Sequence, residues 1–202
     1  MATMRNTRAR WTVAGALVAV ATAAVVGRVI AGQFVSRDPS SFQADLGTGA
    51  VTRVADIDAA NGLPVRGVFA RVTSGGQLCL WDAPSAASQE GQGGCNPLSD
   101  PLGGALLSAS LAYEGGPAAA DVGDARLIGL AAPTVASVRV LMTDGSYRVT
   151  SLRGATIQGQ RYGAFGYRFR RRDLQRGVTP VAVVAFDRSG KEIDRQATGF
   201  GG

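Results

Sequence analysis

Hydrophobic residues are distributed along this chain in two distinct ways. One long apolar run extends from Trp11 to Ile30, and no acidic residue precedes Asp38. After it, apolar residues recur in short stretches that alternate with polar ones and are separated by turns rich in Gly, Ser and Asp. A long run is typical of a membrane helix, and alternation with a period of two is typical of strands with one buried face. The pattern therefore predicts a membrane helix followed by a mainly β domain.

The long run is long enough to cross a bilayer as a helix. Twenty helical residues rise about 30 Å, which matches the hydrocarbon core of a membrane. Arg5, Arg8 and Arg10 precede the run and favour a cytoplasmic N-terminus. Arg28 lies near the far end, where its side chain can extend to the lipid headgroups. We therefore expect a single-pass anchor at residues 11–31, behind a short cytoplasmic tail at residues 1–10.

Cleavage of the same run as a signal peptide is the alternative. The triplets Ala19-Val20-Ala21 and Ala21-Thr22-Ala23 resemble the small-residue sites at which signal peptides are cut. The run is longer than a usual signal core, which favours the anchor. Both interpretations place residues 32–202 outside the cytoplasm, either tethered to the cell membrane or secreted.

Short strands separated by turns account for most of the remaining chain. Residues 65–73 and 77–82 flank Ser74-Gly75-Gly76, which predicts a hairpin, and residues 137–152 predict another that turns at Asp144-Gly145. Further strands are predicted at residues 107–113, 163–172, 179–187 and 191–199, the last of them at a sheet edge. Such a series of short strands is typical of an antiparallel β-sandwich, either Ig-like or barrel-like. We expect a juxtamembrane linker at residues 32–61, with a short helix or a loose lead-in at residues 51–61, and the β-sandwich ectodomain at residues 62–202.

The two cysteines, Cys79 and Cys95, are predicted to form a disulfide. Thiols outside the cytoplasm are oxidised, and an even number of cysteines is typical of a bridge. Closing a loop of about 17 residues contributes roughly 3 kcal/mol through loop-closure entropy. A zinc site would lack ligands, because the chain has no histidine, and a redox centre would need a Cys-x-x-Cys motif that the sequence does not contain.

The order of strands and turns also resembles a known group of domains. The chain runs from GLPVRGVFARV through LCLWD and a Gly-rich loop to RLIGLAAPTVASVRVLMTDGSYRV and VAVVAFDRSGKEI. This order resembles the uncharacterised extracytoplasmic β-domains of actinobacterial membrane-anchored or secreted proteins. The likeness covers roughly residues 62–195 and depends most on the block from Gly129 to Gly145. It implies the fold and the compartment, and it carries no catalytic residues.

The composition argues against several kinds of catalysis. The absence of histidine excludes Ser-His-Asp, Cys-His and His-metal chemistry. Lys191 beside Ser189 lies in a predicted turn, which is a poor setting for a Ser-Lys dyad. Asp56 and Asp58 faintly resemble part of a calcium loop, but the following glycine is misplaced and no glutamate follows at the required distance. We therefore predict no enzymatic activity, no cofactor and no metal.

An arginine-rich stretch is the strongest functional candidate. On a strand over residues 163–172, alternate arginines would point away from the aromatic residues and could bind phosphates through bidentate hydrogen bonds. The alternative is a solvated polar face that prevents edge pairing. Nucleic acid is not an expected ligand in this compartment. The candidate residues for an anionic surface are Arg161, Arg168, Arg170, Arg171, Arg172 and Arg176.

These features predict a membrane-tethered, non-catalytic extracytoplasmic β-domain that binds a protein, an anionic cell-wall polymer or lipid headgroups. Two alternatives stay open. One is a carboxylate-dependent hydrolase, because any two acidic side chains can meet in a folded protein. The other is a sensor or regulator that acts through a second membrane protein, for which small residues in the anchor would provide a helix contact.

Overall fold

The computed structural model describes residues 49–88, 90–115 and 122–199. The predicted anchor at residues 11–31 and the possible cleavage sites lie outside these residues. Within the described residues, no helix is long and apolar enough to cross a membrane.

The described chain is mainly β and forms three antiparallel sheets of four strands each, as expected for a β-sandwich. The strand orders are β1–β2–β3–β4, here called the N-terminal sheet, β5–β6–β10–β9, the central sheet, and β12–β11–β7–β8, the C-terminal sheet. Their bounds are β1 Thr52–Ile57, β2 Arg66–Val72, β3 Gln77–Ala83, β4 Gln92–Pro97, β5 Leu107–Gly115, β6 Val122–Ala131, β7 Ser137–Met142, β8 Tyr147–Val149, β9 Ser151–Ile157, β10 Gln160–Arg168, β11 Pro180–Phe186 and β12 Glu192–Ala197. A single short helix, α2 (Arg171–Gln175), interrupts the described strands between β10 and β11.

The predicted hairpins are confirmed. β2 pairs with β3 across the Ser74-Gly75-Gly76 turn, and β7 pairs with β8 across Asp144-Gly145, where Gly145 has a positive φ of 78°. β11 is a central strand between β7 and β12, and β12 is an edge strand, as the sequence predicts. Residues 51–61, for which a short helix or a loose lead-in was expected, instead contain β1, which pairs with β2 at the edge of the N-terminal sheet.

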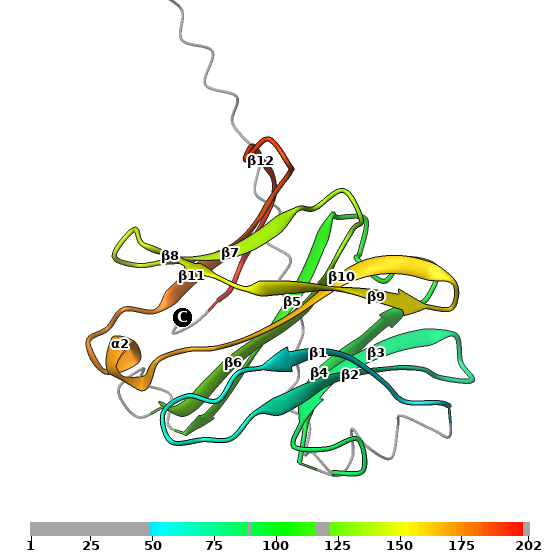
Figure 1. The fold of residues 1–202 in the computed structure, drawn as a ribbon, viewed down its shortest axis with the longest axis horizontal. Coiled ribbons are helices and arrows are strands. Elements are labelled where there is room, and N and C mark those ends of the chain that lie inside the picture. The colour runs from blue at the N-terminus through cyan, green and yellow to red at the C-terminus, as the bar shows by residue number, and fades with distance from the viewer. Residues whose placement is uncertain (1–48, 89, 116–121, 200–202) are drawn as a thin grey trace, which may run out of the picture.

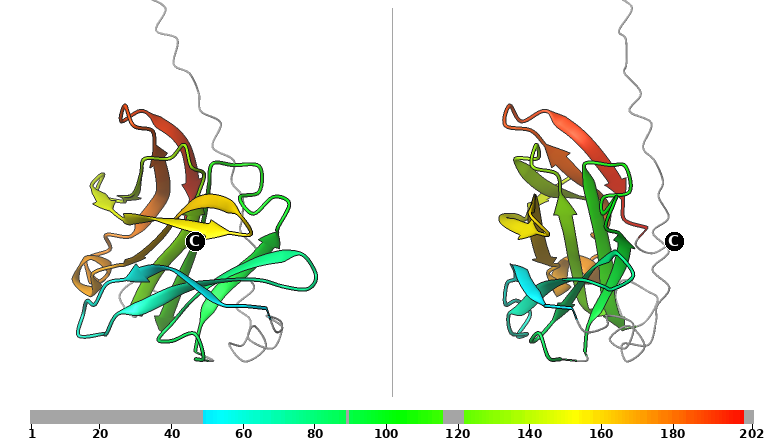
Figure 2. Two further views of the ribbon diagram at one scale, coloured as in Figure 1. Left: turned by 45° about the vertical axis from the view of Figure 1, so that its right-hand side comes forward. Right: turned by 90° about the vertical axis from the view of Figure 1, so that its right-hand side faces the viewer.

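The inner strands of the central sheet, β6 and most of β10, are buried on both faces between the other two sheets (Figure 1), whereas the edge strand β9 is mostly exposed. On β6, Leu127 packs into the cluster shared with the C-terminal sheet, and the next residue, Ile128, packs into the cluster shared with the N-terminal sheet. Gly166 permits the close crossing of β1 over β10, because a Cβ there would lie 2.6 Å from the Ile57 side chain. The two side views in Figure 2 show the N-terminal sheet on one side of the central sheet and the β11–β12 hairpin on the other. Side chains of β6, and of β10 beyond Arg161, therefore enter a packed interior on whichever face they lie.

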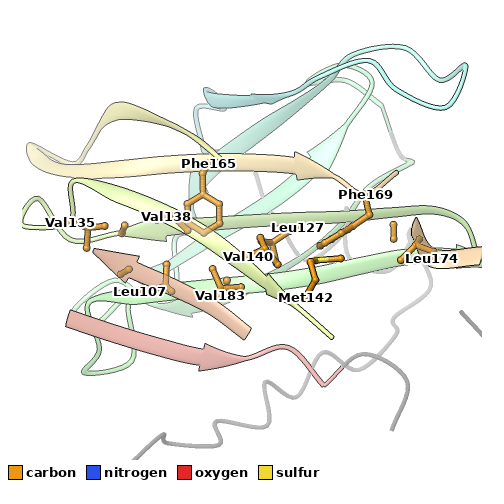
Figure 3. Packing of buried hydrophobic residues seen from close by; sticks show 14 of the residues in the cluster. Leu107, Leu127, Val135, Val138, Val140, Met142, Phe165, Phe169, Leu174 and Val183 are labelled. Carbon is orange, nitrogen blue, oxygen red and sulfur yellow. The ribbon is translucent and has the colours of Figure 1, made fainter. Parts of the chain in front are cut away.

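The larger apolar cluster lies between the central and C-terminal sheets. Figure 3 shows Phe165 of β10 and Leu127 of β6 facing Val138 and Val140 of β7, with Val183 of β11 closing the layer. The alternation of apolar residues in β7 produces this inward row. Leu174 of α2 is buried at the end of the same cluster, so the short helix is attached to the core.

Side chains of β12 close the outer edge of β5. The Gln196 amide accepts a hydrogen bond from the Ala109 N–H at 2.8 Å and donates to the Ala109 carbonyl at 2.9 Å, so it takes the place of a neighbouring strand. Asp194 accepts from the Leu106 N–H at 2.8 Å. These contacts satisfy backbone groups of an edge that would otherwise be open to pairing with another chain.

The predicted disulfide is confirmed. Cys79 on β3 and Cys95 on β4 are direct cross-strand partners, joined by an S–S bond of 1.98 Å. β4 has the sequence QGGCNP, whose two glycines and proline give it a weak preference for strand structure. The bridge fixes this edge strand to β3 and, through it, to the rest of the N-terminal sheet.

Candidate functional site: an arginine platform beside a buried ionic network

The arginine-rich stretch does not continue as a strand to residue 172. β10 ends at Arg168, Arg170 is the N-cap residue, and α2 begins at Arg171. The expectation that Arg168, Arg170 and Arg172 form one outward row is therefore wrong. Arg168 is only 5% exposed, because its face of β10 is covered by the N-terminal sheet. Four arginines of this segment are exposed, and we call them the arginine platform: Arg170, Arg171, Arg172 and Arg176.

Arg168 belongs instead to a group of charged residues between the N-terminal and central sheets, which we call the buried ionic network. Along each contributing strand, the inward-facing row changes from apolar to charged at the same end of the sandwich. On β6, for example, the apolar Ile128 shares a face with Arg126, two residues before it, and with Asp124, four residues before it. The members of the network are Arg66 of β2, Asp82 of β3, Glu114 of β5, Asp124 and Arg126 of β6, and Arg168 of β10.

Arg126 is the centre of this network. Its side chain has no exposed surface, its Nε lies 2.7 Å from Asp82 Oδ2, and its Nη2 lies 2.9 Å from Glu114 Oε1. Its Nη1 contacts Asp124, which also lies 3.1 Å from Arg168 Nε. Asp82 is shared with Arg66 at 2.7 Å. Three arginines and three carboxylates therefore compensate one another, so the interior holds no unpaired charge at this point.

The environments of the two buried arginines differ. Burial opposes the charge of Arg126, but the nearby carboxylates of Asp82, Asp124 and Glu114 outweigh it and raise the pKa of Arg126. For Arg168, burial lowers the pKa, and Asp124 offsets only part of this effect because Arg126 and Arg66 oppose it. Both guanidiniums stay charged near neutral pH, because arginine side chains are not deprotonated in proteins.

Arg168 also fixes the loop between β1 and β2. Its Nη1 donates to the carbonyl oxygens of Pro64 at 2.8 Å, Asp58 at 3.1 Å and Leu63 at 3.3 Å. Backbone carbonyls of an irregular loop need such partners when they are turned inward. Arg168 is therefore a structural residue that connects β10, β6 and the β1–β2 loop, and it is not available to a ligand.

The arginine platform is held in place by contacts at three points of α2. Leu174 is buried in the core, and Asp173 forms an ion pair with Arg148 of β8 at 3.0 Å. At the start of the helix, Arg170 provides no side-chain cap, and the Asn61 side chain of the β1–β2 loop accepts a hydrogen bond from the Arg171 N–H at 3.0 Å instead. The Asn61 amide also donates to the Phe169 carbonyl at 2.9 Å. The backbone that carries the platform is thus preorganised.

The platform carries an excess of positive charge on its surface. Residues 170–176 contain four arginines and one acidic residue, Asp173. Asp173 pairs with Arg148, and its other oxygen is 4.0 Å from Arg172 Nε. Arg170, Arg171 and Arg176 form no ion pair within the described residues. Exposed guanidiniums without a carboxylate partner can bind anions from solution.

Arg161, the remaining predicted residue of the site, is exposed but lies at the other end of β10. Seven strand steps separate it from Arg168, a distance of about 23 Å. Its side chain points to the opposite face of the central sheet from that of Arg168, because the two positions differ by an odd number of residues. The structure therefore brings together four of the six predicted arginines and leaves Arg161 and Arg168 elsewhere.

The carboxylates of the described residues form no metal site. No group of three or more potential ligands occurs in the described ranges. Asp56, one of the residues considered for a calcium loop, is bound instead by Arg53 at 2.7 Å and by Arg153 at 2.6 Å. A narrow cleft between β3–β4 and β5–β6 is lined mainly by apolar residues, with Asn96, Ser108 and Ser110 as polar members, and none of the residues that line it is acidic.

Sequence reasoning missed the buried ionic network and the role of Asn61. The available signal was the isolated charge within an apolar strand, such as Asp82 in LCLWDA and Arg126 in DARLIGLA. Charges in such positions are rarely buried unless they are paired. Their partners could not be identified, because the packing of one sheet on another depends on residues from several strands that are far apart in the sequence.

Comparisons of the chain with protein-family models, curated proteins and solved structures found no match.

Proposed function

We propose that this protein is a non-catalytic extracytoplasmic binding domain with an Ig-like or barrel-like β-sandwich, tethered to the cell membrane by a transmembrane helix at residues 11–31. Its arginine platform binds anionic groups on a cell-wall polymer or on lipid headgroups. Secretion after cleavage of the N-terminal segment would leave the same binding surface. The likeness to actinobacterial extracytoplasmic domains supports this assignment of compartment.

One observation carries the proposal. Arg170, Arg171 and Arg176 are exposed and lack carboxylate partners among the described residues, and they lie at the two ends of a helix that is held by contacts at three points. A fixed backbone reduces the entropy that is lost when side chains become ordered around a ligand. Elsewhere in the domain, arginines such as Arg53, Arg126 and Arg195 are occupied by acidic partners.

Phosphate is the anion that best suits such a surface. A guanidinium presents a planar set of donors that matches two phosphate oxygens, and several guanidiniums together favour a ligand with repeated phosphates. Phosphodiester-bearing wall polymers and anionic headgroups share this chemistry.

The carboxylate-dependent hydrolase is less well supported. Its general acid and base would need carboxylates that can exchange protons in a cleft. The buried carboxylates of the described residues, Asp82 and Asp124, are both bound by Arg126, and neither lines the cleft between β3–β4 and β5–β6. The regulator alternative depends on residues 11–31, which lie outside the described residues, and no observation favours it over binding.

The test is binding by the full-length protein in nanodiscs of zwitterionic lipid. The triple variant Arg170→Ser/Arg171→Ser/Arg172→Ser should lose about tenfold in affinity at low salt, since three exposed contacts of roughly 0.5 kcal/mol each sum to about 1.5 kcal/mol. Co-sedimentation with anionic vesicles and with purified wall fragments forms two separate arms, which distinguish the two sources of phosphate.

The matched control is Arg161→Ser/Arg188→Ser/Lys191→Ser, which removes the same charge from exposed positions outside the platform. A general attraction between opposite charges would weaken both variants equally. Binding that depends on the platform should weaken only in the first. Equal affinity of the platform variant and the unmodified protein for both kinds of particle would refute the proposal and leave a protein partner as the ligand to be sought.

A further inference from the structure

The β1–β2 loop, whose Asn61 caps α2, has an Asn-Gly dipeptide at its tip, and the backbone of this dipeptide is unusual. Asn61 and Gly62 both have positive φ, 58° and 79°, and they form the two-residue tip between Ala60 and Leu63. The Ala60 N–H donates to the Leu63 carbonyl at 3.2 Å, and the Leu63 N–H donates to the Ala60 carbonyl at 2.9 Å. Asn and Gly are the residues that best tolerate this left-handed conformation.

In this dipeptide the Gly62 nitrogen is unhindered, whereas the Asn61 side chain is held by other residues. Both residues are exposed, and a Cβ added to Gly62 would meet nothing within 4 Å. Within the described residues, the Gly62 N–H donates no hydrogen bond. The neighbouring Asn61 amide, in contrast, uses both its donor and its acceptor to hold the segment from Phe169 to Arg171. An unhindered nitrogen thus lies next to an amide whose identity matters for the position of α2.

We propose that Asn61–Gly62 is a self-deamidation site that weakens the arginine platform when it reacts. The Gly62 nitrogen attacks Cγ of Asn61, a new N–Cγ bond forms, and the Cγ–Nδ2 bond breaks. The former amide leaves as ammonia with the proton of the Gly62 nitrogen. Water then opens the resulting succinimide ring at one of its two carbonyls and gives aspartate or isoaspartate. The sequence of steps needs only water and involves no oxidation or reduction.

The reaction is coupled to the contacts of α2. Ring closure requires the Asn61 amide to leave the Phe169 carbonyl and the Arg171 N–H, so it occurs only while this contact is open. The modified side chain no longer has an N–H donor for the Phe169 carbonyl, and two oxygens facing each other repel. Aspartate also places a negative charge beside Arg171, and isoaspartate adds a methylene to the backbone of the turn.

Two other positions in the same chain provide internal controls. Gln158–Gly159 forms a turn with the same signs of φ, 50° and 76°, but its longer side chain would have to close a six-membered ring, which forms more slowly. Asn96 precedes Pro97, whose nitrogen carries no hydrogen and cannot react in this way. Neither position should convert on the timescale of Asn61.

The first test measures the modification without any ligand. The full-length protein in zwitterionic nanodiscs is incubated at a temperature below its unfolding transition, and peptide mapping by mass spectrometry follows Asn61, Asn96 and Gln158. We expect aspartate and isoaspartate to accumulate at Asn61 alone. If Asn61 is unchanged after a period in which the urea-unfolded protein converts fully, the folded loop protects it and the proposal is wrong.

The second test measures the consequence, which rests on the proposed function of the platform. Asn61→Gly keeps the positive φ and removes both contacts of the cap, whereas Asn61→Asp keeps an acceptor for the Arg171 N–H, loses the donor to the Phe169 carbonyl and adds a negative charge. We expect the Asp variant to bind anionic vesicles or wall fragments about fivefold more weakly than the unmodified protein, with the Gly variant in between. If the Asp variant binds as the unmodified protein does while the arginine triple variant binds about tenfold more weakly, the link between the modification and the platform is wrong. If the triple variant also binds normally, the proposed function itself fails, and the mass-spectrometric result still decides whether the site exists.

Discussion

Arg168 and Arg170 are two residues apart, yet they belong to regions of opposite character. Arg168 lies in the buried ionic network, bound by Asp124 and three backbone carbonyls. Arg170 lies in the arginine platform, exposed and without an ion pair among the described residues. The difference arises from the N-terminal sheet, which covers the central sheet up to the end of β10 and not the helix that follows. The same residue type is structural on one side of this boundary and available for binding on the other.

The comparison also shows what each region can do. Charges taken out of water cost several kcal/mol each unless they are paired and hydrogen-bonded, so a buried network has to be complete. Exposed charges cost little and contribute little to folding, and they remain free to bind a ligand. Loss of an arginine should therefore affect stability in the network and binding in the platform.

The largest effect is expected at the centre of the network. Arg126→Met would leave Asp82 and Asp124 buried without their shared partner, and we expect the free energy of unfolding to fall by about 4–5 kcal/mol. Urea unfolding followed by tryptophan fluorescence measures this change. Arg53→Met is the matched control, because Arg53 pairs with Asp56 on the surface and its loss should cost less than about 1 kcal/mol. A loss at Arg126 as small as that at Arg53 would mean that the network does not hold the two sheets together.

A smaller effect, and the most direct comparison of the two regions, comes from Arg168→Ala and Arg170→Ala. Arg168→Ala leaves Asp124 with one partner fewer and three loop carbonyls without their donor, so we expect a loss of about 3 kcal/mol in the free energy of unfolding. Arg170→Ala should change it by less than about 0.5 kcal/mol, as exposed substitutions usually do. Binding to anionic particles should show the reverse order at low salt. Similar losses of stability in the two variants would contradict the boundary drawn between the regions.

Much of the fold could be predicted from local sequence patterns. The hairpins around Ser74-Gly75-Gly76 and Asp144-Gly145 were recognisable because turn residues and alternating strands are short-range signals. The Cys79–Cys95 bridge was predictable from the number of cysteines and the expected compartment. β1 and β4 were not, because their sequences, TRVADI and QGGCNP, have little apolar alternation and depend on pairing with a stronger neighbouring strand.

For the candidate site, the sequence predicted which residue types take part but not how they are arranged. The sequence correctly places the aromatic residues of β10 on one face, and it indicates that arginines occupy the other. It does not indicate that the N-terminal sheet covers this second face. Packing of one sheet on another depends on residues far apart in the chain. The capping of α2 by Asn61, 110 residues away from Arg171, is hidden for the same reason.

The smallest effect is expected at Asp173, the acidic residue of the platform. Asp173→Asn removes the ion pair with Arg148, which is partly exposed, so the free energy of unfolding should fall by no more than about 1 kcal/mol. The same change removes the only negative charge between residues 170 and 176, and affinity for anionic vesicles or wall fragments should therefore rise about two- to fivefold at low salt. Added salt should reduce this gain, because exposed charges are screened. If affinity decreases while the fold stays intact, the contact with Arg148 contributes more to binding, by positioning the platform, than the negative charge of Asp173 takes away. Arg148→Gln would then be expected to weaken binding to the same extent.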